Sequence, residues 1–538
     1  MTVRPVPPSR RGDLLRSLLV ALVSVAVHAW ILSNTSVTAR DSIGFARYAR
    51  NLLEPARLEP GRSVFGVLRQ EKHPPGYPLM VAVGAKIVGA VRELPPAEQF
   101  LLGAQWASCF AGILLAFPSY AFARRLFDSN IAFCSALLLQ LLPVLARNTS
   151  DGLSDGPFLL FVSTALWLGV RAFQSGGRPL GFLLAGLAVA AAYLIRPEAM
   201  VLPVAFAGTL LLMPLAKKIE FPVAVRGGFA FLLGFAILAA PYMLVIGGIT
   251  NKPAMAVDAN PIEARLPIAG PLFAKTVPSD LQGAKRWGAV AITVCEEWLK
   301  AAHYGVAFYA VLGLVLLFPR ILREPIFWLP LLYGLGHLGV LGLLGFKQGY
   351  ISERHLLPLT LLGTPLAVGG LPRLIELVYR IPKLGPKLRW SYWIPLTVGL
   401  LVVLCLWDLR KPLHEDRYGH KVAGLRLAEE LKKMTPDELE GVVVVDHYEW
   451  AQFFSGRSLD AVPTDPEPSA QKIFFLILEL KPGNELEEVK FQSKRHELAL
   501  KLWKERDAGY EGEELLRYPT GKEAAGRTIV ALWKLKRK

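Results

Sequence analysis

Asp41 is the first residue of this chain whose type and position could support chemistry. It follows the first long apolar segment by some eight residues. A charge this close to hydrocarbon is costly unless it holds or processes a polar group. A carboxylate in this place could take a proton from an acceptor hydroxyl or amine as a general base. Alternatively, it could cap the short amphipathic helix that the apolar spacing after it predicts.

A second cluster, Lys72 and His73, lies in the same loop and precedes Pro-Pro-Gly-Tyr-Pro. Two prolines fix an extended backbone, and the glycine allows another group to come close. We expect both side chains to lie beside the membrane interface, where a lipid phosphate would lie. Alternatively, they mark a helix entry with charges that extend into water. Glu71 and His73 alone are too few ligands to argue a metal site.

Asp151 and Asp155 lie just before and at the start of a later apolar run, in Asp-Gly-Leu-Ser-Asp-Gly-Pro. Capping a helix N-terminus is the commoner role of such residues. If they face the same compartment as Asp41, they could instead bind a sugar or polarise an acceptor.

Two further charged pairs lie at the ends of apolar runs. Arg196 and Glu198 interrupt one run and should pair or face a polar cavity, unless they form an ordinary hairpin turn. Arg354 opens a later run and could bind a phosphate through two hydrogen bonds. The alternative is a weak surface pair between Arg354 and Glu353.

The composition indicates the element that must position these residues. Of 538 residues, 53% are hydrophobic and 19% are charged, against about 25% charged in soluble proteins. Repeated apolar runs of about 20 residues explain the deficit and predict a polytopic, mainly α-helical membrane protein. Basic loops and a phosphate-bearing lipid partner explain the net charge of +16, so no nucleic-acid partner is expected. Four scattered cysteines show no CxxC spacing, and we expect them to be buried.

About eleven membrane-spanning helices are predicted. Their approximate ranges are 14–33, 99–122, 130–147, 157–173, 180–195, 199–216, 227–249, 302–319, 326–345, 355–372 and 392–410. Basic residues fall on alternate connections, which places the N-terminus in the cytoplasm and the C-terminus outside. Residues 78–91 are short and contain Lys86, so they predict a helix that lies at the outer interface within the first external loop. On this topology Asp41, His73 and Asp155 share one side.

Residues 1–410 are predicted to form the membrane domain, and residues 411–538 a small extracytoplasmic α/β domain. The apolar segments 441–446 and 472–480 predict strands, while 424–434 and 493–509 predict helices. Residues 250–301 are predicted to form a long external loop.

The charged clusters and their order resemble those of type C membrane glycosyltransferases. The shared features are an acid after the first span, His-Pro-Pro-Gly-Tyr-Pro, Ser-Asp-Gly-Pro-Phe, Ile-Arg-Pro-Glu-Ala and Glu-Arg-His-Leu-Leu-Pro. The closest resemblance is to bacterial family 39 and aminoarabinose-transferase-like enzymes, related to protein O-mannosyltransferases. It covers roughly residues 14–410.

The resemblance implies an inverting enzyme of the inner membrane and the cell envelope. It would move a sugar from a polyprenyl-phosphate donor to an extracytoplasmic lipid, glycan or protein. It implies Asp41 as the catalytic base and Asp155 as the second acid, with Asp151 as its substitute. Lys72, His73, Arg196 and Arg354 are the implied phosphate ligands, and Glu198 and Glu353 are secondary candidates.

Two departures from the family pattern leave questions open. Asp41 is followed by Ser42 where protein mannosyltransferases have Asp-Glu, and His73 stands where aminoarabinose transferases have lysine. The acceptor, the sugar and any divalent metal therefore stay open, and no other cofactor is expected. A lipid-linked sugar flippase or transporter is the alternative. Transporters commonly show internal repeats and charges near mid-membrane, and neither is found in this sequence.

Overall fold

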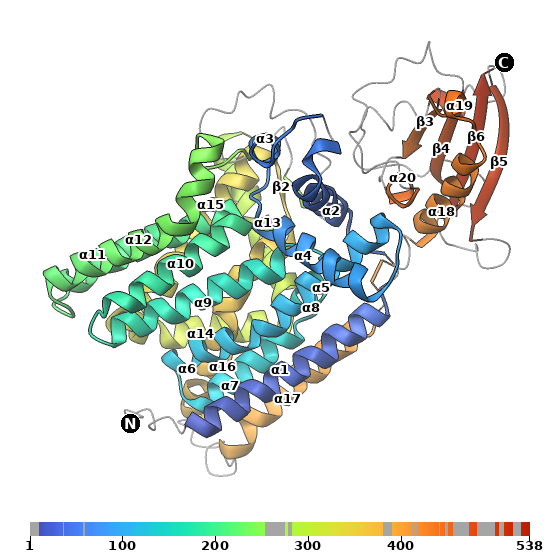
Figure 1. Ribbon diagram of the computed structural model, residues 1–538. Helices are drawn as coiled ribbons and strands as arrows, with labels where there is room; N and C mark the ends of the chain where they lie inside the picture. Colours follow the sequence, from blue (N-terminus) through green and yellow to red (C-terminus); the bar gives the residue numbers. More distant parts are fainter. Residues whose placement is uncertain are drawn as a thin grey trace.

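The computed structural model describes most of the membrane part and pieces of the C-terminal part. The described residues are 10–35, 37–57, 60–252, 275–277, 282–379, 390–411, 413–414, 418–440, 442–446, 450–455, 473–480, 501–504, 510–519 and 529–537. The fold is mainly helical, with a bundle of long helices and a small sheet near the C-terminus (Figure 1).

Within the described residues, eight helical segments are long and apolar enough to cross a membrane. They are formed by α1 (Arg10–Ser33), α5 (Pro96–Leu114) with α6 (Ala116–Leu126), α9 (Asp155–Gln174), η2 (Pro197–Met200) with α11 (Val201–Leu215), α12 (Phe221–Ile246), α14 (Tyr304–Arg323), η4 (Pro325–Phe327) with α15 (Trp328–Gln348), and η5 (Glu353–Leu356) with α16 (Leu357–Tyr379). The remaining predicted spans match shorter helices, which are α7 (Ser129–Leu141) with α8 (Pro143–Asn148), α10 (Pro179–Ile195) and α17 (Trp390–Leu409). The predicted polytopic helical class is confirmed.

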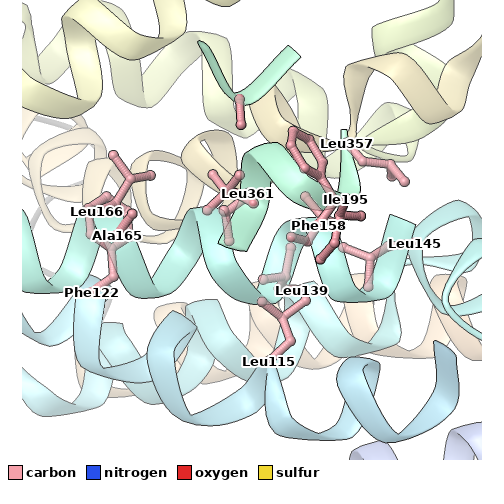
Figure 2. Packing of buried hydrophobic residues seen from close by; sticks show 14 of the residues in the cluster. Leu115, Phe122, Leu139, Leu145, Phe158, Ala165, Leu166, Ile195, Leu357 and Leu361 are labelled. Carbon is pink, nitrogen blue, oxygen red and sulfur yellow. The ribbon is translucent and has the colours of Figure 1, made fainter. Parts of the chain in front are cut away.

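Apolar side chains fill the interior of the bundle and also cover its outside. Leu139, Leu166 and Leu361, from α7, α9 and α16, are at most 1% exposed and pack together in the centre (Figure 2). On α12, by contrast, Phe229 is 71% and Leu244 is 81% exposed. Such apolar surface would be unfavourable in water but suits lipid.

The segment between the first two long helices folds into short helices at one end of the bundle (Figure 1). These are α2 (Arg40–Leu53), η1 (Pro55–Arg57), α3 (Val64–Gln70) and α4 (Gly76–Val91). The predicted interfacial helix corresponds to α4. Leu79, Val83 and Ile87, one turn apart on α4, are 51%, 60% and 61% exposed. This apolar stripe suits contact with the membrane interface.

Close packing fixes α4 against the first half of α5. A Cβ atom on Gly84 would lie 2.5 Å from the carbonyl oxygen of Gly103, so only glycine lets these backbones meet. The Tyr77 hydroxyl donates a hydrogen bond to the carbonyl of Ala104 over 3.0 Å. From Ala104, α4 runs back along α5 toward the start of that helix. It therefore stays at the end of the bundle where α5 begins.

The region predicted as a long loop after α12 is partly helical. Residues 253–274 and 278–281 lie outside the described part, but α13 (Gly283–Ala301) is an amphipathic helix rather than a loop. Two short strands, β1 (Lys275–Thr276) and β2 (Tyr350–Ile351), pair antiparallel. This pair brings the described end of the region next to the segment before Arg354.

The C-terminal part is a mixed sheet with helices, as predicted. It comprises α18 (Tyr418–Lys432), α19 (Pro436–Glu440), β3 (Val442–Asp446), α20 (Trp450–Phe454), β4 (Ile473–Leu480), β5 (Tyr510–Tyr518) and β6 (Ile529–Arg537). The strand order is β3-β4-β6-β5, with β3 and β4 parallel and the other pairs antiparallel.

Both strands predicted from apolar runs are present, as β3 and β4. The helix predicted at 424–434 corresponds to the second half of α18. The sequence interpretation missed β5 and β6, because Glu511, Glu513 and Glu514 interrupt one and lysines alternate through the other. The predicted helix 493–509 lies outside the described residues except for 501–504, which are helical. The domain boundary near residue 410 stays a prediction.

Candidate active site

Asp41 lies in the first turn of α2, where its carboxylate turns toward the bundle. The N-cap of α2 is Ala39, so the capping role considered for Asp41 is not the one observed. Its Oδ2 atom accepts a hydrogen bond from Nη1 of Arg354 over 2.6 Å. The Asp41 side chain keeps 46% of its surface exposed, against 15% for Arg354. A small reactant could therefore still reach the carboxylate.

Arg354 also joins Asp41 to Asp155. Its Nε atom lies 3.6 Å from Oδ2 of Asp155, which is only 1% exposed. The same oxygen lies 2.8 Å from Nη2 of Arg196, whose Nε donates to Ser154 over 2.8 Å. Four charged groups from three span ends and from α2 thus form one cluster, which we call the Asp41–Asp155 cluster: Asp41, Asp155, Arg196 and Arg354.

Glu198 lies beside this cluster and has a partner that the sequence did not indicate. Its Oε1 atom accepts a hydrogen bond from Nζ of Lys252 over 2.6 Å. Since Arg196 pairs with Asp155, the two charged residues of the Arg-Pro-Glu turn bind different partners. The simple hairpin interpretation leaves both of these long-range pairs unexplained.

Lys72 and His73 are both exposed, and the His73 ring lies near enough to Asp41, Glu198 and Arg196 to interact with them electrostatically. The His73 ring lies 5.3 Å from the ring of Phe45 on α2. Desolvation by the surrounding protein and the charge of Lys252 lower the pKa of His73 to about 4, although Asp41 acts in the opposite sense. The ring is therefore uncharged near neutral pH and offers hydrogen bonds rather than charge. The charge of Lys72 acts on the neighbouring Glu71.

Asp151 and Glu353 lie outside the cluster. Asp151 is 5% exposed and accepts hydrogen bonds from the backbone of Ala39 and from His414. Burial raises the pKa of Asp151, and these two partners oppose that effect. Glu353 interacts electrostatically with Glu297, Lys300 and Arg147 rather than with Arg354. The weak surface pair considered for Glu353 and Arg354 is therefore not the arrangement found.

The charge state of Asp41 follows from its neighbours. Desolvation acts to raise the pKa of this carboxyl group, but the charge and the hydrogen bond of Arg354 outweigh it. His73 and Arg40 contribute in the same direction as Arg354. The net effect is a lowered pKa, so Asp41 is ionised at neutral pH and able to accept a proton.

The described residues do not offer a ligand set for a divalent metal. No group of three or more His, Cys, Asp or Glu side chains gathers within that part of the chain. Between Asp41 and Asp155, where a bridging cation would lie, the structure places the guanidinium of Arg354. Arginine thus supplies the positive charge that balances the two carboxylates.

Two surface cavities border the elements around the cluster. One of about 470 Å³ lies between α2, α4 and α5, with Arg50 and Lys86 on its wall. Another of about 270 Å³ lies between the loop that precedes α2 and the C-terminal domain, and Thr38, Glu98 and Lys421 line it. Thr38 precedes Asp41 by three positions, so the second cavity adjoins the start of the Asp41 helix.

Comparison with known structures identifies the fold. An archaeal oligosaccharyltransferase AglB from Archaeoglobus fulgidus, in complex with an inhibitory peptide and dolichol-phosphate, matches with a TM-score of 0.53 and 12% identity, over 90% of this chain and 62% of AglB. ArnT from Cupriavidus metallidurans bound to undecaprenyl phosphate matches with a TM-score of 0.50 and 12% identity, over 96% of this chain and 97% of ArnT. The chain has the type C glycosyltransferase fold.

A second Archaeoglobus fulgidus oligosaccharyltransferase, tethered to an acceptor peptide, matches with a TM-score of 0.58 and 10% identity over 96% of this chain and 80% of its own. Residues 72–240 match the family model described as dolichyl-phosphate-mannose-protein mannosyltransferase. No curated protein sequence matches the chain significantly. The resemblance drawn from the sequence is confirmed, and the chain spans 62% of the length of the first AglB structure.

The side-chain contacts of this chain also show candidate residues that the sequence did not indicate. Lys252 and His414 each bind a predicted acid, but both stand in polar segments without a recognisable pattern. His355 follows Arg354 directly, and its Nδ1 atom accepts a hydrogen bond from the backbone of Ser352 over 3.2 Å. Only its adjacency to Arg354 could have indicated it.

Proposed function

We propose that this protein is a membrane glycosyltransferase that moves one sugar from a polyprenyl-phosphate donor to an acceptor at the cluster end of the bundle. The observation that carries this proposal is the bridge that Arg354 makes between Asp41 and Asp155, with Arg196 on the second carboxylate. Two carboxylates and two guanidinium groups from distant segments meet at one end of the bundle. The fold shared with AglB and ArnT supports the same reaction class.

The reaction requires one proton acceptor and one anion site. The acceptor O–H or N–H attacks the anomeric carbon while the bond from that carbon to the phosphate oxygen breaks, which inverts the configuration. Asp41 takes the acceptor proton, because it is ionised and partly exposed. The departing polyprenyl phosphate carries the electron pair, so cations rather than an acid stabilise it.

Arg354 and Arg196 are the proposed phosphate ligands. Arginine presents a planar fork of donors that matches phosphate oxygens. Asp155, which is almost completely buried, pairs with both guanidinium groups. Asp155 therefore positions the cations, and the donor phosphate would bind on their remaining N–H groups. We propose that His73 is uncharged and forms a hydrogen bond with the phosphate. Lys72 would contact the phosphate only from the exposed edge of the site.

Transfer itself is the decisive test. Purified full-length protein, supplied with polyprenyl-phosphate sugars and with envelope acceptors extracted from a strain that lacks the gene, should release polyprenyl phosphate. Asp41→Asn should lose this release by about 10²- to 10⁴-fold, the usual contribution of a general base. An Asp41→Asn enzyme within a few fold of wild type would exclude the base role.

The same preparation distinguishes a glycosyltransferase from a flippase. A flippase would move the labelled donor between the leaflets of a proteoliposome without releasing polyprenyl phosphate. Mass spectrometry of lipid-linked sugars and envelope glycans after deletion of the gene would identify the sugar and the acceptor. We propose that the cluster end of the bundle faces outward, in line with the distribution of basic loops.

A further inference from the structure

The loop that joins α1 to α2 is held by residues from the far end of the chain. The backbone N–H of Leu413 donates to the carbonyl of Asn34 over 3.2 Å, and Leu413 forms a parallel bridge with Thr35. The indole of Trp30 donates to the carbonyl of Leu409 over 3.3 Å. The chain leaving α17 therefore follows the chain that leaves α1 toward Asp41.

Asp151 joins these two segments at the start of α2. Its Oδ1 atom accepts the N–H of Ala39 over 2.8 Å, and its Oδ2 atom lies 2.7 Å from Nε2 of His414. Both side chains are largely buried, with 7% of Asp151 and 11% of His414 exposed. Ala39 is the N-cap of α2 and has no side-chain cap of its own. Asp151 thus fixes the backbone two positions before Asp41.

The C-terminal domain contacts the same loop from another direction. The indole N–H of Trp450 on α20 donates to the carbonyl of Thr38 over 3.2 Å, and Trp450 is 2% exposed. Nearby, Lys421 on α18 lies 3.5 Å from Glu98 on α5. These contacts attach the domain where α2 begins.

We propose that Asp151, His414 and Trp450 are positioning residues that set the location of the Asp41 helix, so the C-terminal domain completes the active site. They act on α2 through the backbone of residues 38 and 39. Asp41 must stay within reach of Arg354, which lies on a different helix. Misplacement of a reacting group by about 1 Å can cost on the order of 10²-fold in rate.

The first test measures the helix position without any substrate. Hydrogen–deuterium exchange of residues 37–53 is followed in the full-length protein in nanodiscs, for wild type, His414→Ala and Trp450→Phe. Both variants should exchange faster in this segment, while α9 and α10 stay protected. His414→Asn keeps a donor and tolerates the left-handed backbone at this position (φ 54°), so it should restore part of the protection.

The matched control is Arg426→Ala, which removes ion pairs with Glu429 and Glu430 within α18 and should leave exchange of residues 37–53 unchanged. Unchanged exchange in both His414→Ala and Trp450→Phe would overturn the proposal. If His414→Ala unfolds the whole protein, Trp450→Phe alone decides, because it removes the indole N–H and only part of the side-chain volume and keeps an aromatic ring at the site.

The second test is kinetic and rests on the proposed function. In the transfer assay, His414→Ala should lower kcat by on the order of 10- to 100-fold while the KM for the donor stays close to that of wild type. A rise in KM at constant kcat would contradict a positioning role. If wild type shows no transfer but the exchange effect persists, the proposed function fails and the positioning role stands.

Discussion

Arg354→Gln and Asp41→Asn should change the affinity for polyprenyl phosphate in opposite directions. Arg354 is 15% exposed and divides its donors between Asp41, at 2.6 Å, and Asp155, at 3.6 Å. If this guanidinium also binds the donor phosphate, Asp41 competes with the phosphate for it. Removal of the cation should weaken binding, whereas neutralisation of Asp41 should leave binding unchanged or strengthen it.

The size of each effect follows from the exposure of the groups. A hydrogen bond to a charged group contributes about 1.5–3 kcal/mol, so Arg354→Gln should raise the Kd roughly 10- to 100-fold. Asp41 is 46% exposed. An exposed ion pair contributes only about 0.2–1 kcal/mol, so Asp41→Asn should lower the Kd by at most about fivefold.

Undecaprenyl phosphate is a suitable probe because it requires no knowledge of the sugar. Its binding to the full-length protein in nanodiscs is titrated by native mass spectrometry for wild type and both variants. Arg373→Gln is the matched control, since this exposed arginine near the other end of α16 pairs with Glu376, three positions away. Unchanged binding by Arg354→Gln, or weaker binding by Asp41→Asn, would refute the shared-guanidinium reasoning.

Three further outcomes are expected. The pKa of His73 is about 4, so the ring does not become charged between pH 8 and 5.5. Acidification over this range should therefore change the phosphate affinity equally in wild type and His73→Gln. A gain in affinity that wild type shows and the variant lacks would contradict this. Lys252→Met leaves Glu198 without its ion-pair partner and should lower stability by about 1–3 kcal/mol in thermal unfolding. Gly84→Ala should destabilise similarly through its 2.5 Å backbone clash. Gly44 lies within α2 with nothing within 4 Å of an added Cβ atom, so Gly44→Ala should be stabilising by up to about 1 kcal/mol.

The membrane part of the fold was largely predictable, because apolar length is a strong signal. Each predicted span corresponds to helix in the described residues, and residues 78–91 form the short helix α4. The amphipathic α13 was missed because its charged residues resemble a loop, and β5 and β6 were missed because glutamates and lysines interrupt their apolar pattern. Such elements become stable only through the partners they pack against.

Within the candidate site, the identity of the charged residues was more predictable than their pairing. Asp41, Asp155, Arg196 and Arg354 were all indicated by charge next to hydrocarbon, and the structure places them together. The family resemblance implied both Lys72 and Arg354 as phosphate ligands; the structure leaves Lys72 exposed and brings Arg354 to Asp41. How each residue acts in the reaction remains a proposal.

The sequence by itself determined that the chain spans a membrane many times, and where its costly charges lie along the spans. A long apolar run can satisfy its backbone in lipid only as a helix, so composition alone is sufficient. Tertiary structure decided which charge meets which. Asp41 and Arg354 are separated by 313 positions, and His414 and Asp151 by 263. Helix packing brings such pairs together, since it depends on side-chain shape across the whole bundle and not on any local pattern.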